Sequence, residues 1–185
     1  IRDRPMTELV VLAGPDGLPA GTADKAAVHT TDTPLHFAFS AWVIAGGKVL
    51  VTRRALAKQT WPGVWTNSFC GHPAPGEDNV SAVLRRAHFE LGIHAEADQV
   101  REVLPDFSYR AVDSSGIVEH EICPVFVLEL PEDVQLHPNP DEVDSIAWAA
   151  PAALIDAAVA TPFAFSPWMV EEIAEAPLRK AISAL

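Results

Sequence analysis

The chain has 185 residues, enough for one domain with a core of its own, and its formal net charge is −12 at pH 7. This acidity excludes a general role in binding nucleic-acid backbones, which requires an excess of lysine and arginine on one face. No apolar run approaches the roughly 18 residues of a membrane helix, and the first residues lack the apolar core of a signal peptide. The two cysteines, Cys70 and Cys123, are too few for a disulfide framework. We therefore expect a single domain over residues 1–185 that is a cytoplasmic monomer without nucleic-acid or membrane partners.

The first predicted elements are a hairpin and a helix. Between Leu35 and Arg54, two runs rich in β-forming residues flank Gly46-Gly47, which permit the positive backbone angles of a tight turn. Between Asp78 and Gly92, apolar residues recur at helical spacing, with Asp78 or Asn79 as the N-terminal cap and Gly92 as the stop. This second segment is long enough for about three helical turns.

The rest of the chain also predicts strands and helices. A second hairpin is expected from Phe107 to Leu130, with its turn at residues 113–116. A short strand around residues 146–148 precedes a helix from Pro151 to Ala160, and Ser166-Pro167 opens a last helix, which Pro177 kinks or splits. These elements predict one mixed α/β sandwich. The sequence does not give the order of its strands.

Five side chains suggest a metal site. Imidazole and carboxylate ligands suit zinc or manganese. Because side chains two apart on a strand share a face, the two carboxylates would repel each other and one pKa would rise unless a cation compensates. The alternative is that these are unrelated surface histidines and a solvated acidic strand. The five residues are His29, His36, His72, Glu119 and Glu121.

A cysteine and a basic stretch suggest further chemistry. Cys70 precedes Gly71 and His72, where glycine lets the backbone approach a ligand and the imidazole could hold a thiolate. A buried, inert cysteine is the alternative. Four of the 13 basic residues could clamp phosphate oxygens, or form only a solvated surface. These four are Lys25, Arg53, Arg54 and Lys58.

The segment from Gly71 to Ile93 resembles the Nudix box, G-x5-E-x7-R-E-U-x-E-E-x-G-U, in which U is aliphatic. That box forms a loop-helix-loop whose glutamates hold divalent cations against a diphosphate. The matching positions are Gly71, Glu77, Arg85, Glu90, Gly92 and Ile93. Arg86 stands where the first paired glutamate belongs, and Phe89 replaces another. Because only Glu90 remains of the usual carboxylate cluster, hydrolysis of a diphosphate is not expected.

Longer phrases extend the resemblance over nearly the whole chain. They are HTTDTPLHFAFSAW (29–42), LVTRR (50–54), WPGVWTNSFCGHP (61–73), FSYR (107–110), GIVEHEICPVF (116–126) and SPW (166–168). Together they are similar to the type I isopentenyl-diphosphate isomerases. The resemblance implies a Nudix-type α/β/α sandwich with a mixed sheet. It also implies an enzyme of isoprenoid biosynthesis that moves a double bond between isopentenyl and dimethylallyl diphosphates through a tertiary carbocation.

The same resemblance assigns the catalytic and metal residues. One divalent ion, zinc or manganese, would be bound by His29, His36, His72, Glu119 and Glu121. Glu121 with Tyr109 would form the protonating side, and Cys70 would act on the opposite face of the substrate. Trp168 would stabilise the carbocation through its π face.

The resemblance also assigns the diphosphate contacts. Glu90, joined by the backbone carbonyl of Cys70, would bind a magnesium ion that bridges the diphosphate. The anion-binding side chains would be Lys25, Arg54 and Lys58. Arg53 should point away from Arg54 along a strand. His120 replaces the asparagine that relatives often carry, and by alternation it should face away from the site.

Two other functions remain open from the sequence. The Nudix box favours a pyrophosphohydrolase acting on nucleotides, although Arg86 and Phe89 remove carboxylates that this chemistry needs. The second is a non-catalytic module that binds a metal or a diphosphate, in which Cys70 and the histidines only brace the fold.

Overall fold

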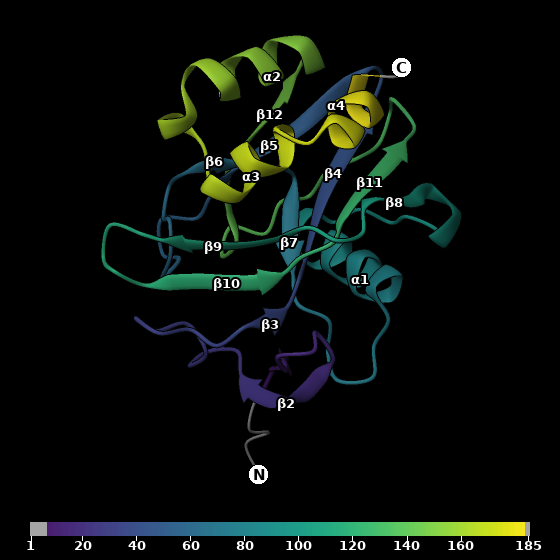
Figure 1. The fold of residues 1–185 in the computed structure, drawn as a ribbon. Coiled ribbons are helices and arrows are strands. Elements are labelled where there is room, and N and C mark those ends of the chain that lie inside the picture. The colour runs from purple at the N-terminus through teal and green to yellow at the C-terminus, as the bar shows by residue number, and fades with distance from the viewer. Residues whose placement is uncertain (1–6, 184–185) are drawn as a thin grey trace.

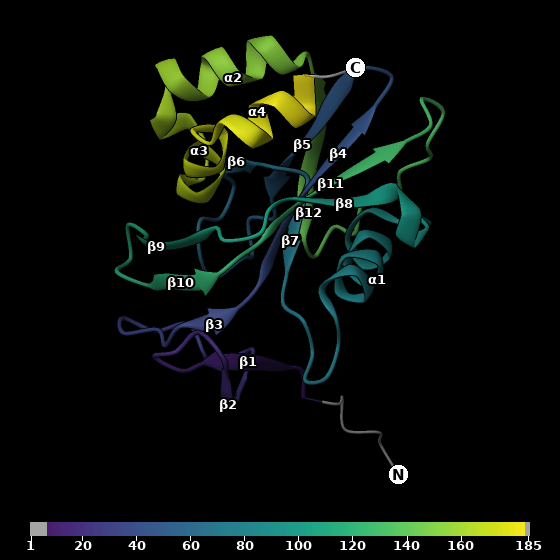
Figure 2. The ribbon, with the colours of Figure 1, turned by 45° about the vertical axis from the view of Figure 1, so that its right-hand side comes forward.

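A computed structural model describes residues 7–183, so the predicted domain of residues 1–185 extends slightly beyond the described part at each end. Two sheets and four α-helices make up the fold, with α1 on one side of the larger sheet and α2, α3 and α4 on the other (Figures 1 and 2). The predicted α/β/α arrangement is therefore confirmed. Among the described residues, no helix has the length and apolar character needed to cross a membrane.

The larger sheet is mixed and forms the centre of the fold. Its strands follow the order β12-β5-β4-β11-β8, and the short strands β6 and β7 pair with β5 and β4. Only the pairing of β4 with β11 is parallel among its described ladders. The strands are β4 (Phe39–Ala45), β5 (Lys48–Arg54), β6 (Trp65–Thr66), β7 (Phe69–Gly71), β8 (Val100–Leu104), β11 (Val125–Leu130) and β12 (Val143–Ala149).

Strand β4 is buried along its whole length because both of its faces are covered. Phe39, Ala41 and Val43 pack in the core beneath α1, whereas Trp42 and Ile44 pack in the core beneath the other three helices. This period of two places the apolar side chains of the strand alternately in the two cores. A fully buried strand therefore carries the two layers of the sandwich.

The smaller sheet lies beside the larger one and has the order β2-β1-β3-β10-β9. Its β3 and β10 pair in parallel, whereas β10 and β9 form an antiparallel hairpin. The strands are β1 (Leu9–Ala13), β2 (Pro19–Asp24), β3 (His36–Phe37), β9 (Ser108–Val112) and β10 (Val118–Ile122). β1, β2 and β8 were not predicted from the sequence.

The helices agree with their sequence signals. The N-cap of α1 is Asp78, whose side chain accepts a hydrogen bond from the Ser81 amide, and the C-cap is Gly92 in the left-handed conformation. Pro177 lies in the first turn of α4, so the predicted last helix is split. The helices are α1 (Asn79–Leu91), α2 (Pro151–Ala160), α3 (Pro167–Ile173) and α4 (Ala176–Ser183), with short 3-10 turns η1 (Ala97–Gln99) and η2 (Pro162–Ala164).

The first hairpin is confirmed, but the second is shorter than predicted. Gly46 and Gly47 both have positive φ angles, at 55° and 71°, in the turn between β4 and β5. The predicted hairpin of residues 107–130 ends at Ile122, and the chain then enters the other sheet as β11. Pro124 separates the two strands, and proline lacks the N–H needed to continue a ladder.

Glu172 differs from the acidic residues of the surface because its carboxyl group lies in the core. Glu172 on α3 is fully buried, and its Oε1 accepts a hydrogen bond from Trp42 Nε1 at 3.0 Å. Its Oε2 has no hydrogen-bond partner among the described residues. Burial raises the pKa of Glu172 to about 8, so the group is held as a neutral acid at neutral pH.

Glu172→Gln should raise stability more at pH 8 than at pH 5. The unfolded chain ionises this group near its ordinary pKa of 4.5, whereas the folded chain retains the proton up to a pKa of about 8, so stability falls as pH rises through this window. Glutamine keeps an oxygen for Trp42 and has no proton to lose. We expect a gain in unfolding free energy of roughly 1–4 kcal/mol at pH 8 and about 1 kcal/mol or less at pH 5. Urea denaturation at the two pH values measures it, and an equal change at both would contradict this explanation.

Candidate active site

Three histidines and one glutamate converge on a common point. One ligand atom from each of His29, His36, His72 and Glu121 lies within 4.8 Å of the ligand atoms of the other three. The three imidazole centroids are 5.2–5.9 Å apart. His29 Nε2, His36 Nε2 and both ring nitrogens of His72 are buried and have no hydrogen-bond partner within residues 7–183. Buried polar atoms are rarely left unpaired, and this donor set is typical of a divalent metal site.

Strand pairing places these ligands. Glu121 on β10 lies opposite His36 on the parallel strand β3 and opposite Tyr109 on the antiparallel strand β9. His36 Nδ1 lies 2.9 Å from the Pro34 carbonyl oxygen. Because a carbonyl oxygen can only accept a hydrogen bond, Nδ1 must carry the hydrogen. This contact sets the tautomer and leaves Nε2 with its lone pair directed at the cluster.

Glu119 lies beside the four converging residues rather than among them. Its Oε2 is 3.0 Å from His29 Nε2, and its Oε1 accepts a hydrogen bond from Thr60 Oγ1 at 3.1 Å. Burial and the charge of Glu121 raise the pKa of Glu119, whereas hydrogen bonding to Glu119 and His36 outweighs burial and lowers the pKa of Glu121. Without a cation, the two carboxyl groups therefore differ in proton affinity, as expected for close carboxylates.

Tyr109 and His72 are both held in their neutral forms. Burial, reinforced by the charge of Glu121, raises the pKa of the Tyr109 phenol well above its usual range. Burial, reinforced by the neighbouring His36, lowers the pKa of His72 well below its usual range. A phenol that keeps its proton can donate it, and a neutral imidazole can bind a metal.

Cys70, Trp168, Glu121 and Tyr109 line one cavity. Its volume is about 280 Å³. Burial, followed by the nearby charge of Glu172, raises the pKa of the Cys70 thiol. Trp168 is 3% exposed, and its ring centroid lies 5.2 Å from that of Trp61 and 5.9 Å from that of Tyr109. One wall of the cavity is therefore aromatic.

Asn67 connects the cysteine and the tryptophan. Its Oδ1 accepts a hydrogen bond from Trp168 Nε1 at 3.1 Å, and its Nδ2 donates to Ser40 Oγ at 2.8 Å. The thiol of Cys70 makes long contacts of 3.5 Å with Ser40 Oγ and Asn67 Nδ2. A fully buried amide thus holds both the sulfur and the indole in place.

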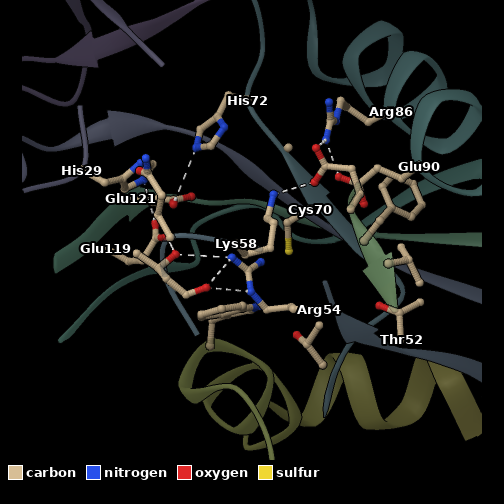
Figure 3. A pocket seen from close by; sticks show the side chains of 18 of the residues that line it. His29, Thr52, Arg54, Lys58, Cys70, His72, Arg86, Glu90, Glu119 and Glu121 are labelled. Carbon is tan, nitrogen blue, oxygen red and sulfur yellow. Dashed lines mark hydrogen bonds and ion pairs between the residues drawn. The ribbon is translucent and has the colours of Figure 1, made fainter. Parts of the chain in front are cut away.

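Three of the four predicted basic residues line the cavity, and Figure 3 labels two of them, Arg54 and Lys58. Lys25, Arg54 and Lys58 all line it, whereas Arg53 pairs with Asp144 at 2.9 Å outside it, as alternation along β5 predicts. The Arg54 guanidinium carbon lies 5.4 Å from the Trp168 ring centroid. The cavity lining carries four basic side chains and four carboxyl groups, so its charges are balanced although the protein is acidic. A small anion could bind the basic side chains.

Helix α1 brings the Nudix-like box to the cavity. Gly71 lies so close to the helix that a Cβ there would approach Arg86 Cγ and Phe39 Cζ to 2.7 Å. Arg85 pairs with Glu77 at 2.8 Å and donates to the His72 carbonyl at 3.1 Å, which ties the helix to the residue that directly follows β7. Glu90 is buried in the cavity wall and pairs with Arg86. The helix thus presents one carboxylate, already paired, where the box would present several.

The cavity brings together residues that the sequence predicted and others that it missed. Of the residues that the resemblance assigns to the site, all line the cavity except His36, which is fully buried. Sequence reasoning missed the contributions of Thr60, Asn67 and Glu142. Asn67 lies in the segment of residues 61–73 that carries the resemblance, but no role was predicted for it. Glu142 carries no local signal, because its partner Lys58 is 84 positions away.

Comparisons with known proteins agree with this geometry. Residues 34–169 match the NUDIX domain family. The fold resembles that of DR0079 from Deinococcus radiodurans, with a TM-score of 0.68 and 19% identity over 90% of this chain and 98% of that chain. It also resembles a MutT protein from Methanosarcina mazei Go1, with a TM-score of 0.61 and 18% identity over 80% of this chain and 96% of that one. Fold and box thus define a Nudix-type protein, and these two likenesses concern the fold alone.

More similar relatives identify the family. The isopentenyl-diphosphate Delta-isomerase of Corynebacterium glutamicum is 55% identical over 95% of this chain and 94% of its own. The protein of the same description from Corynebacterium diphtheriae is 58% identical over 95% of this chain and 97% of its own. The chain belongs to the isopentenyl-diphosphate Delta-isomerases.

We predict that the histidine cluster binds one divalent ion per chain and that chelators remove it. His72→Ala deletes an imidazole whose ring nitrogens have no hydrogen-bond partner among the described residues, so the variant should bind the ion at least ~10-fold more weakly. His94→Ala, on an exposed histidine outside the cavity, is the matched control. Elemental analysis after dialysis, with a chelator competition assay, measures both. Equal metal content in the two variants would rule out His72 as a ligand.

Proposed function

We propose that the chain catalyses the interconversion of isopentenyl diphosphate and dimethylallyl diphosphate, a step of isoprenoid biosynthesis. The identity of 55% and 58% to isopentenyl-diphosphate Delta-isomerases over almost the whole chain is the observation that carries this conclusion. The cavity supports it, because one pocket combines candidate metal ligands, an aromatic wall, a cysteine and basic side chains. Neither rival function is favoured by an observation of its own.

The reaction needs two proton-transfer groups. A proton is added to the terminal carbon of the double bond, a tertiary carbocation forms, and a proton is lost from the allylic carbon. We assign Glu121 with Tyr109 to one transfer and Cys70 to the other. The raised pKa of Tyr109 supports a donor role, because a phenol that keeps its proton can pass it on or hold a hydrogen bond to Glu121. Cys70 lines the same cavity with only long hydrogen bonds to its sulfur.

The residues of the cluster fit zinc or manganese. Unpaired buried imidazole nitrogens and a carboxylate match the ligands that these ions prefer, and we assign the ion to the cluster residues, with Glu119 as a further ligand. A bound cation would supply positive charge beside Glu121. The histidines and Glu119 would then hold the carboxylate of Glu121 in one orientation toward the cavity.

The basic side chains of the cavity fit a diphosphate. Lys25, Arg54 and Lys58 would bind its oxygens, and Glu90 with the Cys70 backbone carbonyl would hold a magnesium ion that bridges it. Magnesium would neutralise phosphate charge beside Glu90. The substrate would therefore lie with its anionic end at the basic residues and its carbon skeleton along the aromatic wall.

We assign the stabilisation of the carbocation to Trp168. The Arg54 guanidinium already lies within cation–π distance of this ring, which supports its suitability as a cation-facing surface. The hydrogen bond from its indole N–H to Asn67 fixes the plane of the ring.

We further propose that residues 1–185 form a single isomerase domain that acts as a cytoplasmic monomer on allylic and homoallylic diphosphates. Both cysteines are free thiols, which suits a reducing compartment. All residues assigned to the site come from one chain, so a second subunit is not needed to complete it.

Direct assay tests the activity. The protein with magnesium and zinc or manganese should convert isopentenyl diphosphate to dimethylallyl diphosphate, measured by NMR of the products. Cys70→Ala and Glu121→Gln should each reduce kcat by at least ~100-fold, the low end of general acid–base contributions. Cys123→Ala, which removes the other free thiol, is the matched control and should stay near the wild-type rate. Absence of turnover in the wild-type protein would overturn the function, and a normal rate in Cys70→Ala would remove only that residue.

Substitutions of Trp168 separate its π face from its bulk. Trp168→Phe keeps a weaker π face, whereas Trp168→Leu keeps apolar volume without one, and both lose the hydrogen bond to Asn67. Cation–π attraction of a desolvated indole is worth ~2 kcal/mol or more, so the leucine variant should lose at least ~10-fold more kcat than the phenylalanine variant. Thermal melts control for cavity effects. Similar kcat values at matched stability would leave Trp168 as a packing residue.

A further inference from the structure

Arg86 is a buried cation that needs an anionic partner. It is 4% exposed, and its NH2 pairs with Glu90 one helical turn along α1. Its Nε has no hydrogen-bond partner among the described residues, and its guanidinium carbon lies 4.7 Å from the Phe89 ring centroid. A buried charge that loses its partner is strongly destabilised, because neither water nor another dipole replaces the lost interaction.

The assignment of magnesium to Glu90 creates a conflict with this pairing. The carboxylate that would bind magnesium is the one that neutralises Arg86 (Figure 3). Two cations would then share one carboxylate in a site that is nearly closed to solvent. Either the diphosphate that arrives with the ion or a second carboxylate must then compensate the guanidinium, because Arg86 also lines the cavity.

Glu142 is the carboxylate within reach. It precedes β12, its Oε1 lies 3.8 Å from Arg86 NH2, and its Oε2 pairs with Lys58 Nζ at 2.5 Å. Its side chain also lines the cavity. Although burial opposes it, the charge of Lys58 lowers the pKa of Glu142, so the carboxylate is ionised at neutral pH. A small movement of either side chain would convert the distance of 3.8 Å into a direct hydrogen bond.

We propose that Glu142 is a positioning residue that takes over the pairing of Arg86 when Glu90 binds magnesium. This inference rests on the proposed role of Glu90. In the structure, Arg86 is paired with Glu90 and only near Glu142. In the loaded state, Arg86 would pair with Glu142, and the carboxylate of Glu90 would be free for the ion. The exchange keeps each buried charge next to an opposite one in both states.

For Glu142→Gln, the proposal and a simple charge argument predict opposite changes in the affinity for magnesium pyrophosphate. Removing a negative charge from the cavity should strengthen binding of an anionic ligand such as magnesium pyrophosphate through weaker repulsion. If Glu142 is needed to compensate Arg86, Glu142→Gln should instead weaken that binding. The change keeps the size of the side chain and leaves the backbone hydrogen bonds of residue 142 intact.

Calorimetry with magnesium pyrophosphate tests this difference. We expect the Kd of Glu142→Gln to be at least ~10-fold higher than that of the wild-type protein in magnesium. In EDTA, the same variant should bind metal-free pyrophosphate as well as the wild-type protein or better. Weaker binding in EDTA as well would show that Glu142 acts through Lys58 and would overturn the proposal. Unchanged or tighter binding in magnesium would also overturn it.

Two further variants complete the experiment. Asp144→Asn removes the carboxylate that pairs with Arg53 outside the cavity and should leave the Kd within about twofold of the wild-type value. In an Arg86→Met background, which has no buried guanidinium, the additional Glu142→Gln change should cost little, and an undiminished loss there would contradict the proposal.

The Glu90→Gln variant separates the two inferences. If this variant binds magnesium pyrophosphate like the wild-type protein, the assignment of magnesium to Glu90 is wrong. If it loses affinity and Glu142→Gln does not, the role of Glu90 stands and only the role of Glu142 is overturned. Circular dichroism confirms that each variant is folded.

Discussion

The position of β10 between β3 and β9 is the constraint on which the site depends. Backbone pairing places Glu121 opposite His36 on one side and opposite Tyr109 on the other. Because side chains alternate along a strand, a shift of one residue would turn Glu119 and Glu121 to the opposite face of the sheet. The chain leaves this sheet at Pro124 and continues as β11 beside the fully buried β4, so the central core of the sandwich anchors the register.

Charge compensation organises the rest of the cavity. Buried ionisable groups are stable only where opposite charges or hydrogen bonds replace water. The cavity satisfies this requirement along a series of contacts from Lys58 through Glu142 and Arg86 to Glu90. In the histidine cluster, by contrast, buried ring nitrogens have no hydrogen-bond partner among the described residues, and they lie close to the carboxylate of Glu121. Both features are consistent with a site in which cations complete the structure.

The Nudix-like box keeps its structural residues and has lost most of its carboxylates. Gly71 is retained because a Cβ would collide with Phe39 and Arg86, and Arg85 with Glu77 still fastens α1 to His72, which directly follows β7. Arg86 instead stands where a glutamate would provide a metal ligand. The same frame therefore holds a different arrangement of charges, which illustrates why function has to be argued from a site and not from a fold.

The sequence by itself determined the local elements and the identity of the chemical groups. The glycine turn at residues 46–47, the capped helix α1 and the shared face of Glu119 and Glu121 follow from backbone preferences and from side-chain period, which act over a few residues. The family resemblance added the grouping of the histidines with Glu121. Only the tertiary structure decided that the second hairpin ends at Ile122, that Arg86 is buried against Glu90 and that Glu142 approaches Arg86. These features depend on segments more than 50 residues apart or on burial, and no local pattern encodes the packing that brings such segments together.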